Sequence, residues 1–200
     1  MEEKIGREFN SLKEVLENLF LEVYNANDAI PDDAVCEQIG KIILAAKLKI
    51  PSASTKENVE SVFVPKKMAQ LMGFSEEELL GKIKANPKYP IVFYRGGPML
   101  IVSQIFDDNP PGVVPFGAAG LFYRGIVEEA IKLLGSDHFY IIPSSKVELM
   151  LVKCSDFDDP GKILKIVLDV NKVPDAVPPE LVLGDFLMEY KDGQFLTVEF

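Results

Sequence analysis

The stretch that most constrains the fold runs from Phe116 to Cys154. It holds an apolar helical segment that ends at Gly135, followed by two β-rich runs, His138–Ile142 and Val147–Val152, on either side of a polar Pro-Ser-Ser sequence. Both runs carry apolar residues on both faces, which predicts strands that are buried on both sides. The segment therefore predicts the centre of an α+β domain with a packed core.

The flanking segments complete the predicted fold. Apolar residues at steps of three and four predict two helices, over residues 5–23 and 35–46, packed as an amino-terminal helical hairpin. After residue 90 the elements are expected in the order β-β-α-β-β-α-β-β, as an antiparallel or mixed sheet of about six strands with its helices on one face. The predicted domains are a helical region at 1–50 and an α+β domain at 62–200, with a polar linker at 52–58.

Local signals place several element ends. Ser75 and Glu78 have the spacing of a capping box, and Pro160 suits the first turn of a helix. Residues 95–98, Arg-Gly-Gly-Pro, predict one hairpin turn, and the Asp-Gly pair at 192–193 predicts another.

The charge balance excludes some partners. With 21 Lys+Arg against 31 Asp+Glu, the net charge is −10, and the basic residues do not cluster. Nucleic acids and anionic membranes are therefore not expected partners. The start of the chain lacks a basic segment followed by an apolar core, and no apolar run reaches the roughly 20 residues that span a bilayer, so a cytoplasmic location is predicted.

The two cysteines, Cys36 and Cys154, share no short ligand or redox spacing. Apolar neighbours predict that both are buried free thiols. No metal and no cofactor is expected, because the acidic loop residues lack a matching cluster of His or Glu.

A serine-hydrolase arrangement of Ser144, Ser145, Glu148 and the sole histidine, His138, is not favoured. The chain has no G-x-S-x-G motif. His138 and Ser144 would also sit at opposite ends of one strand, roughly 20 Å apart at ~3.3 Å per residue. Whether the protein is an enzyme stays open, and the residues lean against it.

A ligand pocket is the second possibility for this region. The backbone N–H groups at the predicted helix start at Gly117 could bind an anion. Together with Arg124, Ser144, Ser145 and Glu148 they define a candidate pocket for a small molecule or nucleotide. Alternatively, the small residues 117–120 let the helix approach the sheet closely, and Pro143, Ser144 and Ser145 form a structural turn.

Part of the chain resembles an uncharacterised bacterial family, domain of unknown function 5688. The similarity is carried by Gly117-Ala-Ala119, Leu121-Phe-Tyr123, Ile142-Pro-Ser-Ser145, Val170-Asn171 and Pro179–Leu183. It covers about residues 62 to 200, and the layout is more distantly similar to YtpQ-like uncharacterised proteins. Family members commonly carry His-Glu after Pro-Ser-Ser-Ile, where this chain has Val147-Glu148. The resemblance implies a family but no reaction.

Two functions are weighed. The leading hypothesis is a non-catalytic binding or adaptor module of the bacterial cytoplasm. The alternative is a small-molecule or nucleotide-binding protein with a pocket near Gly117 and the Pro143-Ser144-Ser145 turn. An extended apolar face on the Ile5–Val23 helix would point to a homodimer.

Overall fold

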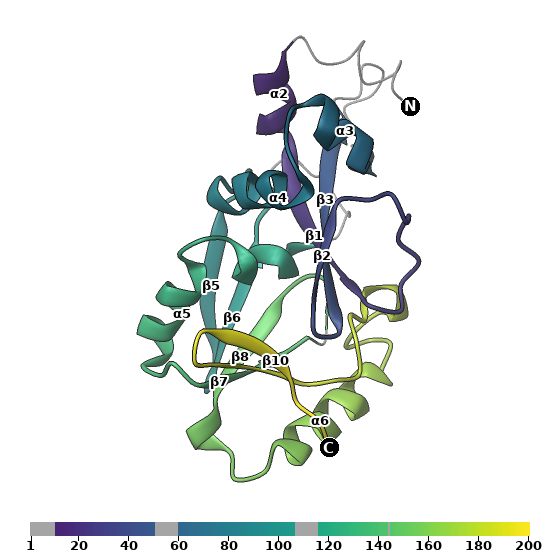
Figure 1. The fold of residues 1–200 in the computed structure, drawn as a ribbon. Coiled ribbons are helices and arrows are strands. Elements are labelled where there is room, and N and C mark those ends of the chain that lie inside the picture. Colours follow the sequence, from purple (N-terminus) through teal and green to yellow (C-terminus); the bar gives the residue numbers. More distant parts are fainter. Residues whose placement is uncertain (1–10, 51–59, 107–115, 144) are drawn as a thin grey trace.

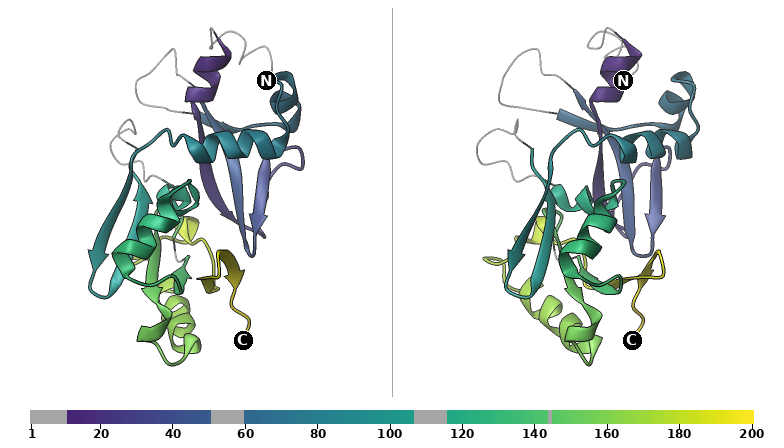
Figure 2. Two further views of the ribbon diagram at one scale, coloured as in Figure 1. Left: turned by 60° about the vertical axis from the view of Figure 1, so that its left-hand side comes forward. Right: turned by 90° about the vertical axis from the view of Figure 1, so that its left-hand side faces the viewer.

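The fold is α+β, with two antiparallel sheets and helices packed around them (Figure 1). The computed structural model describes residues 11–50, 60–106, 116–143 and 145–200. The amino-terminal sheet and the larger sheet lie at opposite ends of the molecule, as the turned views make clear (Figure 2). The predicted linker at 52–58 lies outside the described residues.

The amino-terminal sheet is built around one long central strand. Its strands are β1 (Leu19–Asn25), β2 (Cys36–Ile39), β3 (Ile42–Ile50) and β4 (Glu60–Phe63). On one side, β1 pairs with β3 along nearly its whole length. On the other side, β2 pairs with the first half of β3 and β4 pairs with the second half. All these pairs are antiparallel.

The predicted amino-terminal helical hairpin is wrong. Among residues 11–50, helix is confined to α2 (Leu12–Glu17), which Ser11 caps by accepting a hydrogen bond from the Glu14 N–H. The segments 19–25 and 42–50 are strands that are almost wholly buried. A strand buried on both faces shows no alternation, so its apolar residues also match helical spacing. Gly40, with a φ of 59°, makes the turn between β2 and β3.

The larger sheet contains six antiparallel strands in the order β10-β9-β7-β8-β6-β5. Its strands are β5 (Ile91–Gly96), β6 (Met99–Gln104), β7 (Phe139–Ile142), β8 (Leu149–Lys153), β9 (Met188–Lys191) and β10 (Gln194–Thr197). From residue 91 onward the strands and longer helices follow the expected order. The Asp-Gly turn forms at 192–193, with both residues at positive φ.

The helices do not lie on one face of this sheet, contrary to the prediction. Helix α5 (Ile126–Leu134) contributes to the apolar cluster that contains Ile141 of β7, whereas α6 (Pro160–Asn171) contributes to a separate cluster that contains Ile142. Consecutive strand residues point to opposite faces, so the two helices cover opposite sides. The predicted helix over 118–134 is also interrupted, because Gly125 adopts a φ of 84° between the 3-10 helix η1 (Gly117–Phe122) and α5.

Short helices complete the fold. They are α3 (Lys66–Leu71), α4 (Glu76–Ala85), η2 (Cys154–Asp156) and η3 (Pro179–Leu181). The predicted capping box at the start of α4 is confirmed, since Ser75 and Glu78 exchange hydrogen bonds. Asp159 caps α6, directly before Pro160. Within the described ranges, no helix has the length and apolarity that a bilayer crossing requires.

The 3-10 helix η1 lies at the junction of the two sheets. A Cβ atom on Gly117 would lie 2.2 Å from Ser103 Oγ and 2.6 Å from the Val147 carbonyl oxygen, so η1 packs directly on β6. The buried hydroxyl of Tyr123 accepts a hydrogen bond from the Leu21 N–H of β1, at 3.0 Å. One apolar cluster contains residues of both sheets. The predicted domain division stays a prediction.

Candidate functional sites

An apolar groove with a volume of about 860 Å³ lies beside the amino-terminal sheet and is larger than the three other hollows described below. Its lining residues, which define the apolar groove, are Leu12, Pro31, Asp33, Ala34, Lys47, Ser61, Val62, Phe63, Pro65, Lys67, Met68, Leu71 and Met72. Leu71 is 72% exposed and Leu12 is 46% exposed. Ligand sites typically measure about 300–1,000 Å³ and are mostly apolar, so the size and lining of this groove suit a bound apolar group.

A buried ion pair lies at this groove. The Lys47 Nζ is 3.4 Å from the Glu22 carboxylate, and both side chains are less than a tenth exposed. Tyr24 donates a hydrogen bond from its hydroxyl to Glu22, and the Lys47 ammonium lies 4.1 Å from the centre of the Phe63 ring. Burial, and then the charge of Glu22, raise the pKa of the Tyr24 hydroxyl well above its ordinary value. Lys47 is thus fully engaged within the fold.

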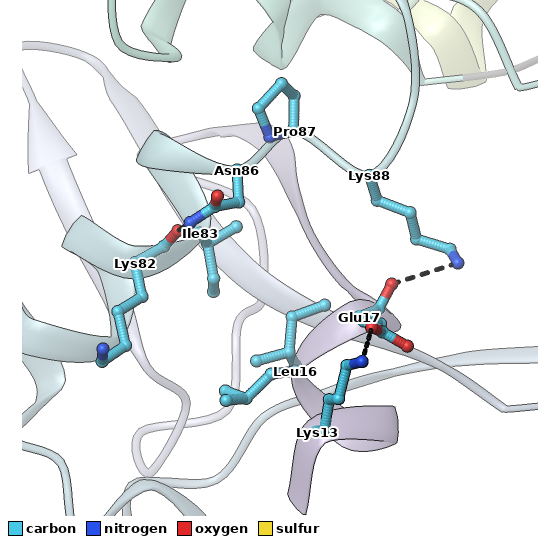
Figure 3. A pocket seen from close by; sticks show the side chains of 9 residues that line it. Lys13, Leu16, Glu17, Lys82, Ile83, Asn86, Pro87 and Lys88 are labelled. Carbon is cyan, nitrogen blue, oxygen red and sulfur yellow. Dashed lines mark hydrogen bonds and ion pairs between the residues drawn. The ribbon is translucent and has the colours of Figure 1, made fainter.

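A pocket of about 360 Å³, lined by both charged and apolar residues, lies between α2 and the end of α4 (Figure 3). The ammonium of Lys88 donates to the Glu17 carbonyl oxygen at 3.3 Å and to the Asn18 side-chain oxygen at 3.0 Å. Lys13 forms an exposed pair with Glu17, at 3.6 Å. Exposed pairs of this kind are typical of a solvated surface, so the pocket offers little to a specific ligand.

Two further hollows have different linings. One, of about 320 Å³, lies between α6 and the six-stranded sheet and includes Phe157 and Val170. The other, of about 590 Å³, lies between β2 and α4, with Glu37 and Lys84 at its edge. Glu37 and Lys84 already form an ion pair with each other, so these two charges are engaged within the fold.

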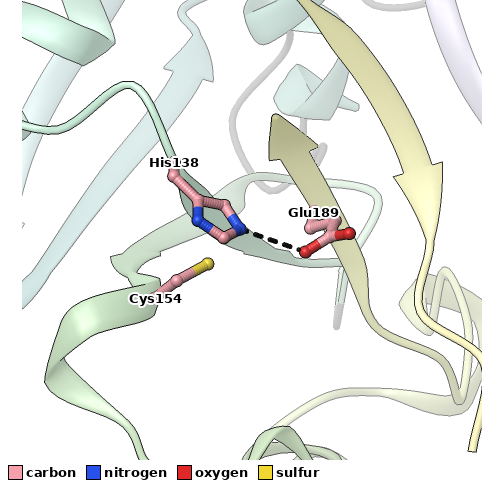
Figure 4. Close-up of side chains that lie close together, drawn as sticks. All are labelled: His138, Cys154 and Glu189. Carbon is pink, nitrogen blue, oxygen red and sulfur yellow. Dashed lines mark hydrogen bonds and ion pairs between the residues drawn. The ribbon is translucent and has the colours of Figure 1, made fainter. Parts of the chain in front are cut away.

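A cluster of three chemically active side chains forms on the six-stranded sheet (Figure 4). His138 directly precedes β7, Cys154 directly follows β8, and Glu189 belongs to β9. Strand β7 lies between the other two, and Phe139 pairs with both of them. This register brings together three residues that are far apart in the sequence. We call them the His-Cys-Glu cluster.

The His-Cys-Glu cluster is compact and half-exposed. The His138 Nε2 lies 3.2 Å from the Glu189 carboxylate, and one donor atom from each residue lies within 4.8 Å of the others. The side chains of His138 and Glu189 are 39% and 25% exposed. Burial, and then the charge of Glu189, raise the pKa of the Cys154 thiol to about 11, although a hydrogen bond with Tyr140 opposes the shift. A thiol with a raised pKa is a poor nucleophile.

The sequence prediction missed this cluster. It expected Cys154 to be buried, whereas both cysteines are half-buried free thiols. It expected no metal site, and it did not single out Glu189. The placement of His138 and Cys154 at the ends of neighbouring strands was a usable signal, since antiparallel strands bring such ends together. The third residue depends on the pairing of β7 with β9, which no local pattern predicts.

The structure places two of the predicted pocket residues in the connection between β7 and β8. Ser145 is buried, and its Oγ accepts a hydrogen bond from the Val147 N–H at 2.9 Å. Glu148 accepts a hydrogen bond from the Tyr94 hydroxyl, and burial raises the pKa of its carboxyl. Ser144 lies outside the described residues. The Ser145 bond fits a structural turn.

The remaining predicted residue, Arg124, lies between η1 and α5. It is exposed, and its backbone N–H donates to the Lys84 carbonyl oxygen of α4. None of the four hollows is lined by Arg124, Ser145 or Glu148. The close packing of Gly117 on β6 confirms that small residues permit a close approach to the sheet. The pocket near Gly117 stays a prediction.

Comparison with known proteins gave no match: no family model, no curated protein and no solved structure matches this chain. The structure is that of an α+β protein with two antiparallel sheets, an apolar groove and the His-Cys-Glu cluster. The family resemblance stays a hypothesis.

Proposed function

We propose that this protein is a non-catalytic binding or adaptor module that holds an apolar segment of a partner protein in the apolar groove. The observation that carries the proposal is the 72% exposure of Leu71 at the rim of a groove of about 860 Å³. Grouped exposed apolar side chains mark interaction sites on proteins. The bacterial cytoplasm, the family resemblance and a homodimer remain hypotheses.

The groove suits an extended peptide. Val62 and Phe63 belong to β4, which pairs with β3 on one side and has no second strand among the described residues. A partner strand could hydrogen-bond to that edge while alternate side chains enter the groove. Met68 and Met72 line the groove, and flexible thioether side chains adapt to different apolar groups. The proposed occupant is therefore an extended segment rich in apolar residues.

The polar residues of the groove support binding over catalysis. Lys47 is held by Glu22 and by the Phe63 ring, which leaves its ammonium unavailable to a substrate. A catalytic site needs a nucleophile or an acid–base pair within reach of the substrate. The other polar groups of the lining, Asp33, Ser61 and Lys67, suit the polar rim of a binding groove.

A random peptide library selected against the wild-type protein tests the proposal. Peptides rich in apolar residues should be enriched, and Leu71→Asp should weaken their binding at least about 10-fold, because a charge would be desolvated at the rim. Leu196→Asp is the matched control, since Leu196 is also exposed, at 40%, and lies in β10. Backbone N-methylation of alternate peptide residues should remove binding if the peptide adds to β4.

The outcome that contradicts the proposal is also defined. If no apolar peptide is enriched, or if Leu71→Asp and Leu196→Asp weaken binding equally, the groove is not the binding surface. If N-methylated peptides bind as well as the parent peptides, the groove binds side chains without strand addition.

A further inference from the structure

We propose that His138, Cys154 and Glu189 form a binding site for one divalent transition-metal ion, with zinc as the best fit. The site lies on the six-stranded sheet and does not depend on the function proposed for the apolar groove.

The donor atoms favour zinc over the hard divalent cations. Imidazole nitrogen, thiolate sulfur and carboxylate oxygen are the three side-chain donor types that zinc binds in proteins. Magnesium and calcium take oxygen donors, of which the cluster offers only the carboxylate of Glu189. A soft sulfur beside a nitrogen therefore selects a borderline metal.

The distances are close to those of a metal site. Zinc–donor bonds of about 2.0–2.3 Å in a tetrahedron place neighbouring donor atoms about 3.3–3.8 Å apart. The His138 Nε2 and the Glu189 Oε2 are already 3.2 Å apart, and all three donors lie within 4.8 Å of one another. The three side chains point toward one another in Figure 4. Movements of about 1 Å, within the range of small side-chain rotations, bring the donors to bonding distance.

The scaffold holds the three residues in place. Strand β7 is hydrogen-bonded to both β8 and β9, and the Cys154 N–H donates to the His138 carbonyl oxygen at 3.3 Å. Ser136 fixes the backbone of His138, since its hydroxyl donates to the carbonyl oxygen at 2.8 Å and accepts from the N–H at 3.2 Å. The Tyr140 hydroxyl can donate to a bound thiolate, and such outer hydrogen bonds orient metal ligands.

The same residue types could also activate a thiol for nucleophilic attack. That reading requires a substrate cleft and an oxyanion hole beside the sulfur. The four hollows described above among the described residues have linings that do not include His138, Cys154 or Glu189. A metal ion needs no cleft: three ligands leave one position for water, and the half-exposed cluster gives the ion a path from solvent.

Cobalt(II) provides a direct test, because it occupies zinc sites and reports its ligands by absorption. Tag-free, reduced protein should bind one cobalt ion per chain and show a sulfur-to-cobalt charge-transfer band, with the strong visible bands of four-coordinate cobalt. Zinc should displace the cobalt. Cys154→Ser should abolish the charge-transfer band and lower zinc affinity by more than about 100-fold, whereas Cys36→Ser should bind as the wild type.

Alkylation of the wild-type protein gives a second test that needs no variant. With zinc bound, iodoacetamide should label Cys154 at least about 10-fold more slowly, because a coordinated thiolate is shielded, and the labelling of Cys36 should not change. Mass spectrometry of the digested chain separates the two sites. A wild-type protein that shows no charge-transfer band at millimolar cobalt, or equal zinc effects on both cysteines, overturns the proposal.

Discussion

Each sheet carries one pair of an acidic and a basic side chain, and the two pairs differ in their exposure to solvent. In the amino-terminal sheet, Glu22 and Lys47 have side chains only 8% and 9% exposed, and Tyr24 donates a further hydrogen bond to the carboxylate. In the six-stranded sheet, Glu189 and His138 are 25% and 39% exposed. The first pair is enclosed, whereas the second faces solvent beside a thiol.

The two pairs therefore differ in what the loss of one partner would cost. A buried charge is strongly destabilising without its partner, because the remaining ion then has neither solvent nor a counter-charge around it. A half-exposed pair contributes little to the stability of the fold and can exchange one partner for another at small cost. The pair of His138 and Glu189, together with Cys154, therefore has the freedom that a binding site requires. Each of the following predictions tests or sharpens this contrast.

The largest effect is expected for Lys47→Met. Methionine keeps most of the packing against Phe63 but leaves Glu22 buried without its counter-charge, so the free energy of unfolding should fall by about 3–5 kcal/mol. Urea denaturation of both proteins measures the difference. The double variant Lys47→Met/Glu22→Leu should recover most of the loss. A loss below about 1 kcal/mol in the single variant would show that the pair is not enclosed in solution.

A slightly smaller effect is expected at the junction of the two sheets. In Gly117→Ala the new Cβ would lie 2.2 Å from Ser103 Oγ and 2.6 Å from the Val147 carbonyl oxygen, so the backbone must move. Overpacking of this kind should lower the free energy of unfolding by about 3 kcal/mol.

The matched control for Gly117→Ala is Gly81→Ala in α4, where a Cβ would meet nothing within 4 Å. Alanine is the better helix former, so this variant should gain about 0.5–1 kcal/mol. Equal effects of the two substitutions would mean that η1 does not pack on β6 as described.

Much of the fold was predictable where local chemistry decides it. The turn at 192–193 and the cap at Ser75 depend on neighbouring residues, and both form as predicted. The helix prediction for the segments 19–25 and 42–50 was wrong for a physical reason. Strands buried on both faces lose the alternating pattern, so their apolar residues fit a helix equally well. Gly40 lies between two apolar runs and forms a turn there, and this glycine could have indicated two strands in place of one helix.

The candidate site was less predictable than the fold. His138 and Cys154 could have been placed together by pairing β7 with β8, because these strands are adjacent in the sequence. Glu189 joins them through the pairing of β7 with β9, across the whole of α6. Such long-range register is set by the packing of the complete sheet, and a single sequence does not reveal it.

A third prediction concerns the hydrogen bond between Tyr123, at the end of η1, and Leu21 of β1. Burial raises the pKa of the Tyr123 hydroxyl from 10.0 to about 12, so the folded protein resists its ionisation. The full contribution is present below pH 10. Between pH 10 and 12 the unfolded chain loses this proton first, and the free energy of unfolding should fall by about 2 kcal/mol.

Tyr123→Phe isolates that contribution. The variant loses the hydrogen bond to the Leu21 N–H, so it should be less stable at pH 8. Its stability should then fall less steeply than that of the wild type above pH 10, since the other titrating groups are common to both proteins. Parallel pH profiles would show that Tyr123 is exposed to solvent in the folded protein.

The smallest effect is expected for His138→Gln in a buffer that contains a chelator. Glutamine keeps a polar side chain near Glu189, and the pair is half-exposed, so the free energy of unfolding should change by less than about 1 kcal/mol. Zinc should then separate the two proteins: it should raise the melting temperature of the wild type, because a ligand that binds only the folded state stabilises it, and leave His138→Gln unchanged. A loss as large as that of Lys47→Met without metal would mean that the second pair is structural too, and the contrast between the two sheets would disappear.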